Sequence, residues 1–495
     1  MTDKNIVSKY DGIPEKYYTK MQMNNKKATS LVLLLGACLH MSAQQRTPVN
    51  EWLTRADRSA LFQQQAPLTF GKQPALQNVI TVDDKTSYQD IVGFGYALTQ
   101  GSAMHLIRMD KAKRKNILDE LFRTDANNIG ISYIRLSIGA SDLNETVFSY
   151  DDLPAGETDT ALAKFDLGPD RKDVIPVMKE ILAINPAIKV LGSPWSPPAW
   201  MKTNNDTRGG QLKPEYYPAY AKYLVKYIKE MAATGIPIDA ITIQNEPLHP
   251  GNNPSLLMVA PDQATFIKEH LGPAFKKAGL STKIIIYDHN ADRPDYPISI
   301  LDDPQAKKYI DGSGFHLYGG DISALSDVHD AHPDRHLYFT EQMVIERDYW
   351  DNPDTTGRTI RIAHQVKRVL IGAIRNWSRN VLLWNLAADQ DNKPFTDRGG
   401  CPMCQGAITI IGNDVSRNLA YYVIAHASKL VRPGSVRIAS NVTDHLSNVA
   451  FKTPDGKKVL IIANTANEAK PFTIKWGTQT LNTTLDAGAV ATYAW

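Results

Sequence analysis

A chain of 495 residues is too long for a single small core, so its length predicts about two to four domains, or one large barrel with an attached domain. With 43% apolar and 22% charged residues, its composition is ordinary for a soluble globular protein. The net charge of +3 is small and no long basic run accompanies it, which argues against nucleic acid as a partner.

The N-terminus has the pattern of an export signal. A short basic stretch over residues 23–27 precedes a short apolar run over residues 31–39, and this order is typical of signal peptides. The run is too short for a stable anchor, so we expect no transmembrane segment. The alternative interpretation is a buried helix of the mature fold. Residues 1–22 lie upstream of the signal, which makes Met23 a candidate for the true first residue.

Two cleavage sites fit this signal. Residues 35–38 resemble a bacterial lipobox, which would leave a lipid anchor on Cys38, whereas residues 41–43 resemble an ordinary cleavage site before Gln44. We favour the ordinary site slightly. In both cases residues 1–43 form an extension and signal peptide, and the sequence predicts a bacterial protein exported to the periplasm, the outer membrane or the medium.

Apolar strand-like runs then alternate with helical patterns. The expected helices, with apolar residues at a period of 3.6, cover residues 104–122, 171–184, 216–231, 263–275 and 359–377. Eight strands are expected, at residues 91–95, 131–138, 189–195, 240–246, 283–290, 314–318, 336–341 and 380–386. This order predicts an α/β fold, a closed (β/α)8 TIM barrel over residues 86–428. A doubly wound open sheet is the alternative, but no Gly-x-Gly-x-x-Gly follows the first strand.

The C-terminal region changes to short strands. Residues 449–463 predict a β-hairpin around the Asp455-Gly456 turn, and residues 472–476 and 489–495 add further strands. We expect residues 429–495 to form a small β domain, which the strands in residues 44–85 join.

Cys401 and Cys404 form a Cys-x-x-Cys pattern in a glycine-rich loop. Zinc is disfavoured because it needs about four ligands, and no second Cys-x-x-Cys or paired His is present. A redox role is disfavoured because such a motif usually opens a helix in a thioredoxin-like unit. In an exported protein the pattern favours a local disulfide that fixes the loop.

Polar and aromatic side chains fall at the ends of seven predicted strands, and in a barrel these ends face the active site. Aromatic faces with amide and carboxylate groups suit sugar rings, and paired carboxyl groups suit glycoside cleavage. Each residue alone has a structural explanation, such as an ion pair or core packing, but their agreement at one rim favours a site. The candidates are Arg135, Trp195, Asn245, Glu246, Asp288, His289, Asn290, His316, Tyr318, Glu341, Trp384 and Asn385.

Five stretches resemble the glucosylceramidase-like enzymes of glycoside hydrolase family 30. The resemblance runs from about residue 75 to the C-terminus, and its motifs are GFGYALT (93–99), SPWSPPAWMK (193–202), QNEP (244–247), FTE (339–341) and WNL (384–386). Asn-Glu-Pro occurs in many barrel glycosidases, whereas the Ser-Pro-Trp stretch is more specific. The resemblance implies a β-sandwich built from both chain ends and retaining chemistry, with Glu246 as acid/base and Glu341 as nucleophile.

Further roles follow from this resemblance and from retaining chemistry. Glu246 needs a raised pKa to donate a proton, which burial and the charge of Glu341 would cause. The two carboxyl groups are expected about 5–5.5 Å apart. Among the other candidates, Arg135 and Tyr318 are expected to hold Glu341 ionised, Asn245 to bind the sugar 2-hydroxyl, Trp195 and Trp384 to line the sugar subsite, and His316 to support these residues from behind or to contact the rim.

Gln100 departs from the pattern of glucose-specific relatives. Those relatives carry an aspartate after the stretch that matches residues 96–99, where it binds hydroxyls of the terminal sugar. Gln100 is neutral and weakens the case for glucose, so fucose, galactose and xylose stay open at this subsite. The loop at residues 399–404 also resembles that of bacterial relatives, which implies a disulfide near the site.

The sequence therefore predicts a secreted retaining β-glycosidase that acts on a β-linked glycan or glycoside, similar to β-glucosidases and to the glucosylceramidases of sphingolipid metabolism. The alternatives within the family are an endo-β-1,6-glucanase, a β-fucosidase or a β-xylosidase. Exo and endo action are both open because loop shape decides between a pocket and a groove. A non-catalytic glycan-binding protein and a metal or redox protein centred on Cys401 and Cys404 are less favoured. No metal or cofactor is expected.

Overall fold

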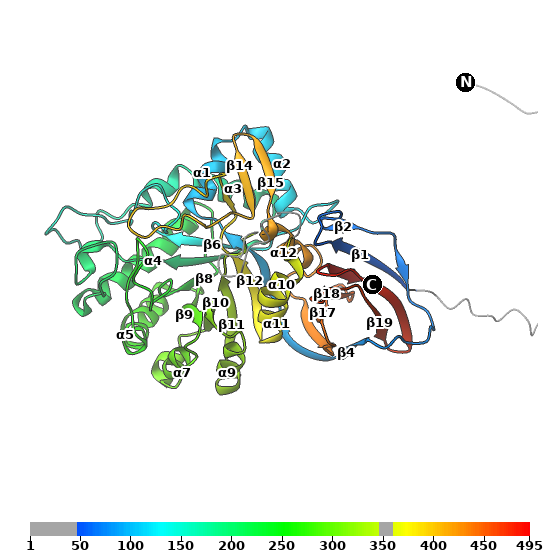
Figure 1. Cartoon of the computed structure of the whole chain (residues 1–495). Helices are drawn as coiled ribbons and strands as arrows, with labels where there is room; N and C mark the ends of the chain where they lie inside the picture. Colours follow the sequence, from blue (N-terminus) through cyan, green and yellow to red (C-terminus); the bar gives the residue numbers. More distant parts are fainter. Residues whose placement is uncertain (1–46, 346–359) are drawn as a thin grey trace, which may run out of the picture. The chain divides into compact units, whose positions relative to one another are not determined.

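The computed structural model describes residues 47–345 and 360–495. The predicted signal peptide, both predicted cleavage sites and Cys38 lie outside the described residues. The described chain contains a closed barrel of parallel strands and a mainly antiparallel sheet that includes the C-terminus (Figure 1). Within these two ranges, no helix has the length and the hydropathy that crossing a bilayer requires.

Eight parallel strands form the barrel and follow one another around it in chain order, with β12 pairing to β5 to close the ring. Each of them overlaps a predicted strand, so the predicted (β/α)8 barrel is confirmed. The strands are β5 (Gly93–Ala97), β6 (Tyr133–Ile138), β7 (Lys189–Pro194), β8 (Ala240–Thr242), β9 (Lys283–Ala291), β10 (Gly312–Gly320), β11 (His336–Glu341) and β12 (Ser378–Leu383).

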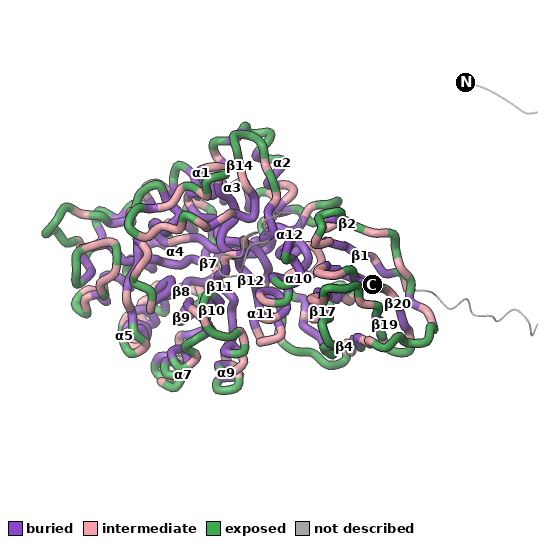
Figure 2. The backbone as a smooth tube through the Cα atoms, in the orientation of Figure 1, coloured by how far each residue is buried: buried purple, intermediate pink, exposed green. Residues whose placement is uncertain are grey.

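The barrel strands are covered on both faces, which explains why most of their residues are buried. Every residue of β5 and of β12 is buried. Figure 2 shows buried backbone in the centre of the barrel and exposed backbone on the outer loops and helices. The mouth of the barrel is therefore carried by a rigid, close-packed wall.

The helices surround the strands, and one of the predicted helices is divided in two. A single helix is expected over residues 104–122, but α1 ends at Arg108 and α2 begins at Lys111, because Met109 adopts an extended conformation. Thr99 caps α1 by accepting a hydrogen bond from the Ser102 N–H. The α-helices are α1 (Gln100–Arg108), α2 (Lys111–Phe122), α3 (Val174–Ile184), α4 (Tyr217–Ala233), α5 (Ala260–Phe266), α6 (Gly272–Ala278), α7 (Asp295–Leu301), α8 (Pro304–Lys307), α9 (Ala324–Ala331), α10 (Ile362–Gln365), α11 (Gly372–Arg375) and α12 (Leu419–Ser428).

Five 3₁₀ and π segments complete this layer in the described residues. Two of them are π-helical, so the helical patterns predicted at residues 263–275 and 359–377 each contain a π segment between two α-helices. The segments are the 3₁₀ helices η1 (Gly168–Arg171), η2 (Ala199–Met201) and η3 (Pro214–Tyr216) and the π-helices η4 (Ile267–Leu271) and η5 (Val366–Ile371).

The second part is a ten-stranded sheet around its own core, built from both ends of the described chain as predicted. The N-terminal β1 pairs with the last strand, β21, and β4 lies between β16 and β19. β4 continues to Asp90, past the expected boundary at residue 85. The strands are β1 (Pro48–Thr54), β2 (Gln63–Gln64), β3 (Leu68–Thr69), β4 (Val79–Asp90), β16 (Val436–Ser440), β17 (Leu446–Lys452), β18 (Lys458–Asn464), β19 (Lys470–Trp476), β20 (Gln479–Leu485) and β21 (Val490–Ala494).

A small third sheet leads back to the barrel mouth. It consists of β13 (Ala387–Ala388), β14 (Ile408–Ile411) and β15 (Asp414–Arg417). The loop between β13 and β14 carries Cys401 and Cys404, which form a disulfide with a Cα–Cα distance of 5.5 Å. The predicted local disulfide is therefore confirmed.

A buried histidine joins the barrel to the ten-stranded sheet. His426 on α12 lies between the hydroxyl groups of Thr54 and Thr492, each 2.9 Å from a ring nitrogen. Burial lowers the pKa of His426 to about 3, so the ring is neutral and acts as a structural link.

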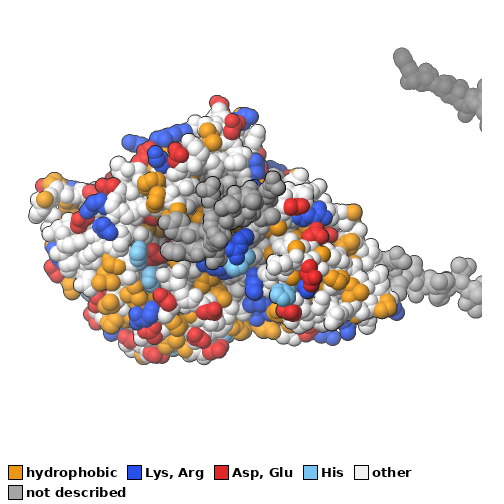
Figure 3. All heavy atoms as spheres, viewed as in Figure 1, with side chains coloured by type: hydrophobic (Ala, Val, Ile, Leu, Met, Phe, Trp, Pro, Cys, Tyr) orange, Lys and Arg blue, Asp and Glu red, His pale blue; other side chains and the backbone are white. Residues whose placement is uncertain are grey.

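Figure 3 shows charged side chains of both signs interspersed over the visible face, in keeping with the small net charge.

Candidate active site

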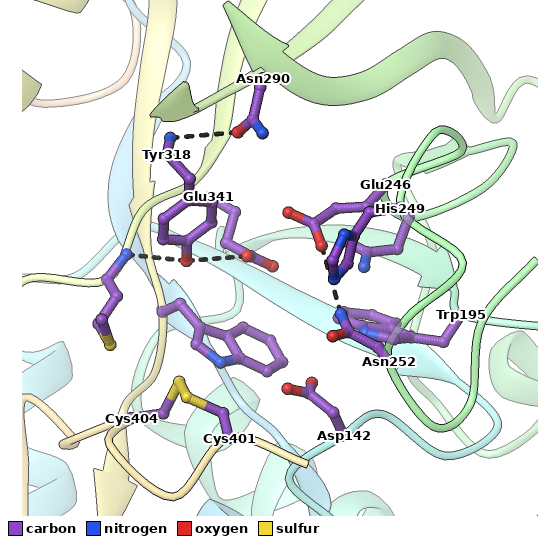
Figure 4. A pocket seen from close by; sticks show the side chains of 13 residues that line it. Asp142, Trp195, Glu246, His249, Asn252, Asn290, Tyr318, Glu341, Cys401 and Cys404 are labelled. Carbon is purple, nitrogen blue, oxygen red and sulfur yellow. Dashed lines mark hydrogen bonds between the residues drawn. A yellow bond between two sulfur atoms is a disulfide. The ribbon is translucent and has the colours of Figure 1, made fainter. Parts of the chain in front are cut away.

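A pocket of about 230 Å³ opens at the carboxyl ends of the barrel strands (Figure 4). Seven of the predicted residues line it, Arg135 and His316 contact members of this group from outside the lining, and Gln100 does not line it. The pocket is lined by Asp142, Trp195, Asn245, Glu246, His249, Asn252, Asn290, Tyr318, Glu341, Met343, Trp384, Cys401 and Cys404.

Glu341 is the last residue of β11, and its carboxyl group is held on both oxygens. Arg135 Nη1 lies 2.5 Å from Oε2, and the Tyr318 hydroxyl donates a 3.0 Å hydrogen bond to Oε1. The same hydroxyl accepts a hydrogen bond from the Met343 N–H at 3.0 Å. Glu341 is therefore fixed in one orientation by a charged and a neutral donor, as the sequence predicts for both partners.

Glu246 faces Glu341 across the pocket from a strained backbone position. Its φ of +46° lies in the left-handed region, which non-glycine residues rarely adopt. Its N–H donates to the Asp288 carbonyl at 3.0 Å and so holds this conformation. Its side chain accepts longer hydrogen bonds, from the Asn252 amide at 3.3 Å and from His316 Nδ1 at 3.3 Å. Each glutamate accepts two side-chain hydrogen bonds, and those to Glu246 are longer than those to Glu341.

Asp288 organises the groups beneath the two glutamates. This fully buried carboxylate accepts hydrogen bonds from Arg135 Nη2 at 2.9 Å, from Thr340 at 2.6 Å and from His316 Nε2 at 3.1 Å. Burial would raise the pKa of Asp288, but Arg135 and His316 hold it well below its usual range. Asp288 is therefore an anion that fixes both cations under the pocket.

His316 carries a positive charge at neutral pH. Burial alone would lower its pKa, but the negative charges of Glu341 and Asp288 and its hydrogen bonds raise the pKa to about 9. Its Nδ1 lies 3.3 Å from Glu246 Oε1 and 3.7 Å from Glu341 Oε1. His316 thus supports both glutamates from behind, the first of its two expected positions, and does not line the rim of the pocket.

The two pocket glutamates titrate as a coupled pair. Burial raises the pKa of Glu341, against the charges of His316 and Arg135. Burial also acts upward on Glu246, but the hydrogen bond from His316 holds its pKa below the ordinary value. The sequence predicts a raised pKa for Glu246. The structure differs because it places a protonated imidazole beside that carboxyl group, so the nearest proton resides on His316 Nδ1.

Two stacked indoles form the aromatic wall. The rings of Trp195 and Trp384 lie 5.3 Å apart at 29°, and the Arg135 guanidinium lies 4.8 Å from the Trp195 ring centre. The buried Nε1–H of Trp195 has no hydrogen-bond partner in the part of the chain that the structure describes. A buried donor without a partner is costly, so a hydroxyl group in the pocket would stabilise it.

Two further polar groups project into the pocket beside the indoles. Asn245 Oδ1 accepts a 2.8 Å hydrogen bond from Arg135, which directs its Nδ2 to other acceptors. Asp142, which the sequence analysis missed, is buried in a turn after β6. Burial, followed by the charges of Glu341 and Glu246, raises the pKa of Asp142 to about 8, so at neutral pH it is protonated and can donate a hydrogen bond.

Gln100, predicted to bind substrate, supports that turn instead. Its Oε1 accepts a 2.7 Å hydrogen bond from Asn144 Nδ2. The Oδ1 of Asn144 in turn accepts hydrogen bonds from the Ser141 N–H at 2.9 Å and from its hydroxyl at 3.0 Å. The Asp142 carbonyl accepts a 2.9 Å bond from the Thr396 N–H. The third carboxyl group in the pocket, besides those of Glu246 and Glu341, therefore comes from Asp142, four residues after β6. Gln100 lies behind it.

Glu246, His316 and Glu341 each place a donor atom within 4.8 Å of the other two, the one such group in the described residues that could hold a metal ion. A protonated imidazole has no free lone pair to bind a cation, and Arg135 already pairs with Glu341. The arrangement suits proton transfer between side chains.

Cleavage of a glycosidic bond requires two carboxyl groups on either side of the bond, in a site that binds a sugar ring. The pocket provides the carboxyl pair, the aromatic wall and the polar groups, and the enzyme is a glycoside hydrolase. The profile of the glycosyl hydrolase family 30 TIM-barrel domain matches residues 91–431, and that of the family's β-sandwich domain matches residues 434–493. The chain belongs to glycosyl hydrolase family 30.

Individual relatives fall into two groups. An endo-1,6-β-D-glucanase of Aspergillus fumigatus is 32% identical over 429 residues, which cover 81% of this chain and 84% of the relative. The lysosomal acid glucosylceramidase of Mus musculus is 28% identical over 442 residues, 84% of this chain and 83% of the relative. The solved structure of an endo-β1,6-glucanase is 35% identical, with a TM-score of 0.83, over 90% of this chain and 99% of the other.

Proposed function

We propose that the protein is a retaining endo-β-1,6-glucanase. The observation that carries this proposal is the difference in identity between the two groups of relatives. The three endo-1,6-β-D-glucanases share 31–33% of residues with this chain, against 28–29% for four glucosylceramidases, and the solved endo-β1,6-glucanase shares 35%. From the sequence alone this activity is the alternative to a glucosylceramidase-like β-glucosidase.

Retention is supported by the carboxyl spacing. One oxygen of Glu246 and one of Glu341 lie within 4.8 Å of each other. Retaining enzymes keep their carboxyl groups about 5–5.5 Å apart, whereas inverting enzymes need about 6.5–9.5 Å to admit a water molecule. In the first step, Glu341 attacks the anomeric carbon as the glycosidic C–O bond breaks, and Glu246 delivers a proton to the leaving oxygen.

The second step reverses the roles of the two glutamates. Water attacks the anomeric carbon, its proton passes to Glu246, and the bond to Glu341 breaks. The proton that Glu246 donates in the first step comes from His316 Nδ1, to which it is hydrogen-bonded. Arg135 and Tyr318 stabilise Glu341 when it leaves as a carboxylate.

The rest of the pocket binds the sugar on the non-reducing side of the cleaved bond. Asn245 Nδ2 can donate a hydrogen bond to the 2-hydroxyl, Trp195 and Trp384 cover the ring, and the Trp195 N–H and Asp142 bind further hydroxyls. These contacts suit a neutral hexose.

The test is hydrolysis of a linear β-1,6-glucan and of β-1,6-linked glucose oligomers. The alternative substrates, assayed separately, are β-1,3- and β-1,4-glucans, glucosylceramide, and aryl β-fucosides and β-xylosides. We expect shorter oligomers of several lengths from β-1,6-glucan and a β-configured first product by proton NMR. Release of glucose as the sole product would show exo action and not endo action. A preference for glucosylceramide would overturn the proposal.

We also propose that the enzyme acts outside the cytoplasm. The disulfide between Cys401 and Cys404 supports this because such bonds persist in oxidising compartments. Mass spectrometry of the protein from its native host tests this: an N-terminus at Gln44 or a lipidated Cys38 is expected, and an intact N-terminus would contradict export.

A further inference from the structure

The loop that follows Glu246 carries two polar side chains into the pocket. His249 and Asn252 belong to this loop (residues 247–255) and line the pocket. Figure 4 shows them on the Glu246 side, with Tyr318 and Glu341 opposite. The acid/base residue must lie next to the leaving oxygen, so groups beside Glu246 face the part of the substrate that departs.

The loop is held rigidly at its base. Asn253 is buried, and its amide donates to the Asp397 carbonyl at 3.1 Å and carboxylate at 3.0 Å, while its Oδ1 accepts from the Thr207 hydroxyl at 2.7 Å. Gly399 approaches so closely that a Cβ there would lie 2.5 Å from the Gly251 carbonyl oxygen. A preformed loop loses little entropy when it binds a ligand.

The chemistry of this side of the pocket is polar. Asn252 Nδ2 donates a 3.3 Å hydrogen bond to Glu246, and the Asn252 Oδ1 has no partner in residues 47–345 and 360–495. Tyr318 is the one exposed large apolar side chain of the described residues that lines the pocket. It lies on the Glu341 side, opposite His249 and Asn252. An imidazole and an amide bind hydroxyl groups, whereas an alkyl chain needs apolar surface.

We propose that His249 and Asn252 form the binding site for the leaving sugar, a second glucose unit whose hydroxyl groups they hydrogen-bond. The proposal rests on the proposed glycosidase function and names the class of leaving group: a hydroxylated sugar, in contrast to a lipid.

The same site would bind an acceptor in the reverse direction. When a sugar replaces water in the second step, its hydroxyl oxygen bonds to the anomeric carbon, the bond to Glu341 breaks, and the hydroxyl proton passes to Glu246. The ratio of transfer to hydrolysis therefore reports on the leaving-sugar site, independently of how the first step proceeds.

The experiment uses an aryl β-glucoside as donor and a β-1,6-linked glucose disaccharide as acceptor, with His249→Ala and Asn252→Ala. His445→Ala, an exposed histidine between β16 and β17, is the control. We expect each pocket variant to lower the transfer-to-hydrolysis ratio by about tenfold, since each loses a hydrogen bond to the acceptor. We also expect kcat/KM to fall about tenfold more for the disaccharide than for the aryl glucoside, and the control to match the wild type.

An unchanged transfer ratio, or equal losses on both substrates, would overturn the proposal, because the residues would then act through Glu246 alone. Failure of the proposed specificity gives a different result: the wild type would cleave the aryl glucoside but not β-1,6-glucan. The transfer ratio with glucose as acceptor would then still decide whether the two residues bind a sugar.

Discussion

Arg135 Nη1 lies 2.5 Å from Glu341 Oε2, and both side chains are buried, Glu341 in the wall of the pocket and Arg135 behind it. Through Nη2, the same guanidinium binds Asp288 at 2.9 Å and Asn245 at 2.8 Å. One side chain from β6 therefore aligns residues from three other strand ends. A buried ion pair of this kind stabilises little when complete, but its loss leaves an unpaired charge.

Replacement of Arg135 should damage both stability and catalysis. Arg135→Met leaves Asp288 and Glu341 with His316 as their one neighbouring cation among the described residues, so we expect the free energy of unfolding to fall by about 3–5 kcal/mol and kcat/KM by at least about 100-fold. Arg293→Met, which breaks an exposed pair with Asp295, should cost less than about 1 kcal/mol. Urea denaturation and steady-state kinetics measure both, and equal effects of the two variants would contradict the role of Arg135.

Removal of the proposed acid should depend on the leaving group. Glu246→Ala should lower kcat/KM for a β-1,6-linked glucose oligomer by about 10²–10⁴-fold, since the departing sugar oxygen then leaves unprotonated. A dinitrophenyl β-glucoside, whose leaving group needs no proton, should lose far less. Azide, which can replace water without a general base, should restore turnover. A uniform loss on both substrates would mean that Glu246 is not the acid.

The pH dependence of activity should follow His316. Its pKa is raised to about 9 from 6.5, so the proton that it shares with Glu246 is fully present below pH 6.5 and is lost as pH rises through about 9. The stability that this imidazolium contributes should disappear over the same interval. In His316→Gln, the alkaline limb of kcat/KM should move to lower pH. An unchanged limb would exclude His316 as the proton source.

The turn that carries Asp142 should control sugar binding. Asn144→Ala removes the contact with Gln100 and frees Asp142, so we expect a higher KM for oligomers with a smaller change in kcat. Asp142→Ala should reduce kcat/KM further, by about 10–100-fold, because it removes a buried hydrogen-bonding group. Asp391→Asn, at an exposed position, is the control. Binding isotherms of a non-hydrolysable glucoside check whether affinity falls from the wild type to Asn144→Ala and further to Asp142→Ala. Identical affinities for the wild type and both variants would contradict this role of the turn.

The fold could be predicted because its signals are local. The barrel strands carry short apolar runs, such as residues 284–287 in β9, and the hairpin between β17 and β18 carries its own Asp-Gly turn. The break between α1 and α2 was missed because apolar residues continue across it. What ends α1 is the extended Met109, which hydrophobic periodicity does not reveal.

The site could be predicted where function lies at strand ends, as for Glu246 and Glu341. The site could not be predicted where loops bring its side chains together. Asp142, His249 and Asn252 reach the pocket because turns far apart in sequence are tied to one another, and sequence does not fix loop shape. The charge of His316 was also missed, because it depends on which carboxylates surround the ring.

The covalent intermediate tests the central claim most directly. A 2-deoxy-2-fluoro-β-glucoside with a good leaving group forms the glycosyl-enzyme and slows its hydrolysis, so the sugar stays attached to the nucleophile. Peptide mapping by mass spectrometry should then find one fluoroglucosyl group, on Glu341. A label on another residue, or inversion at the anomeric carbon without any labelled peptide, would contradict the two-glutamate retaining mechanism.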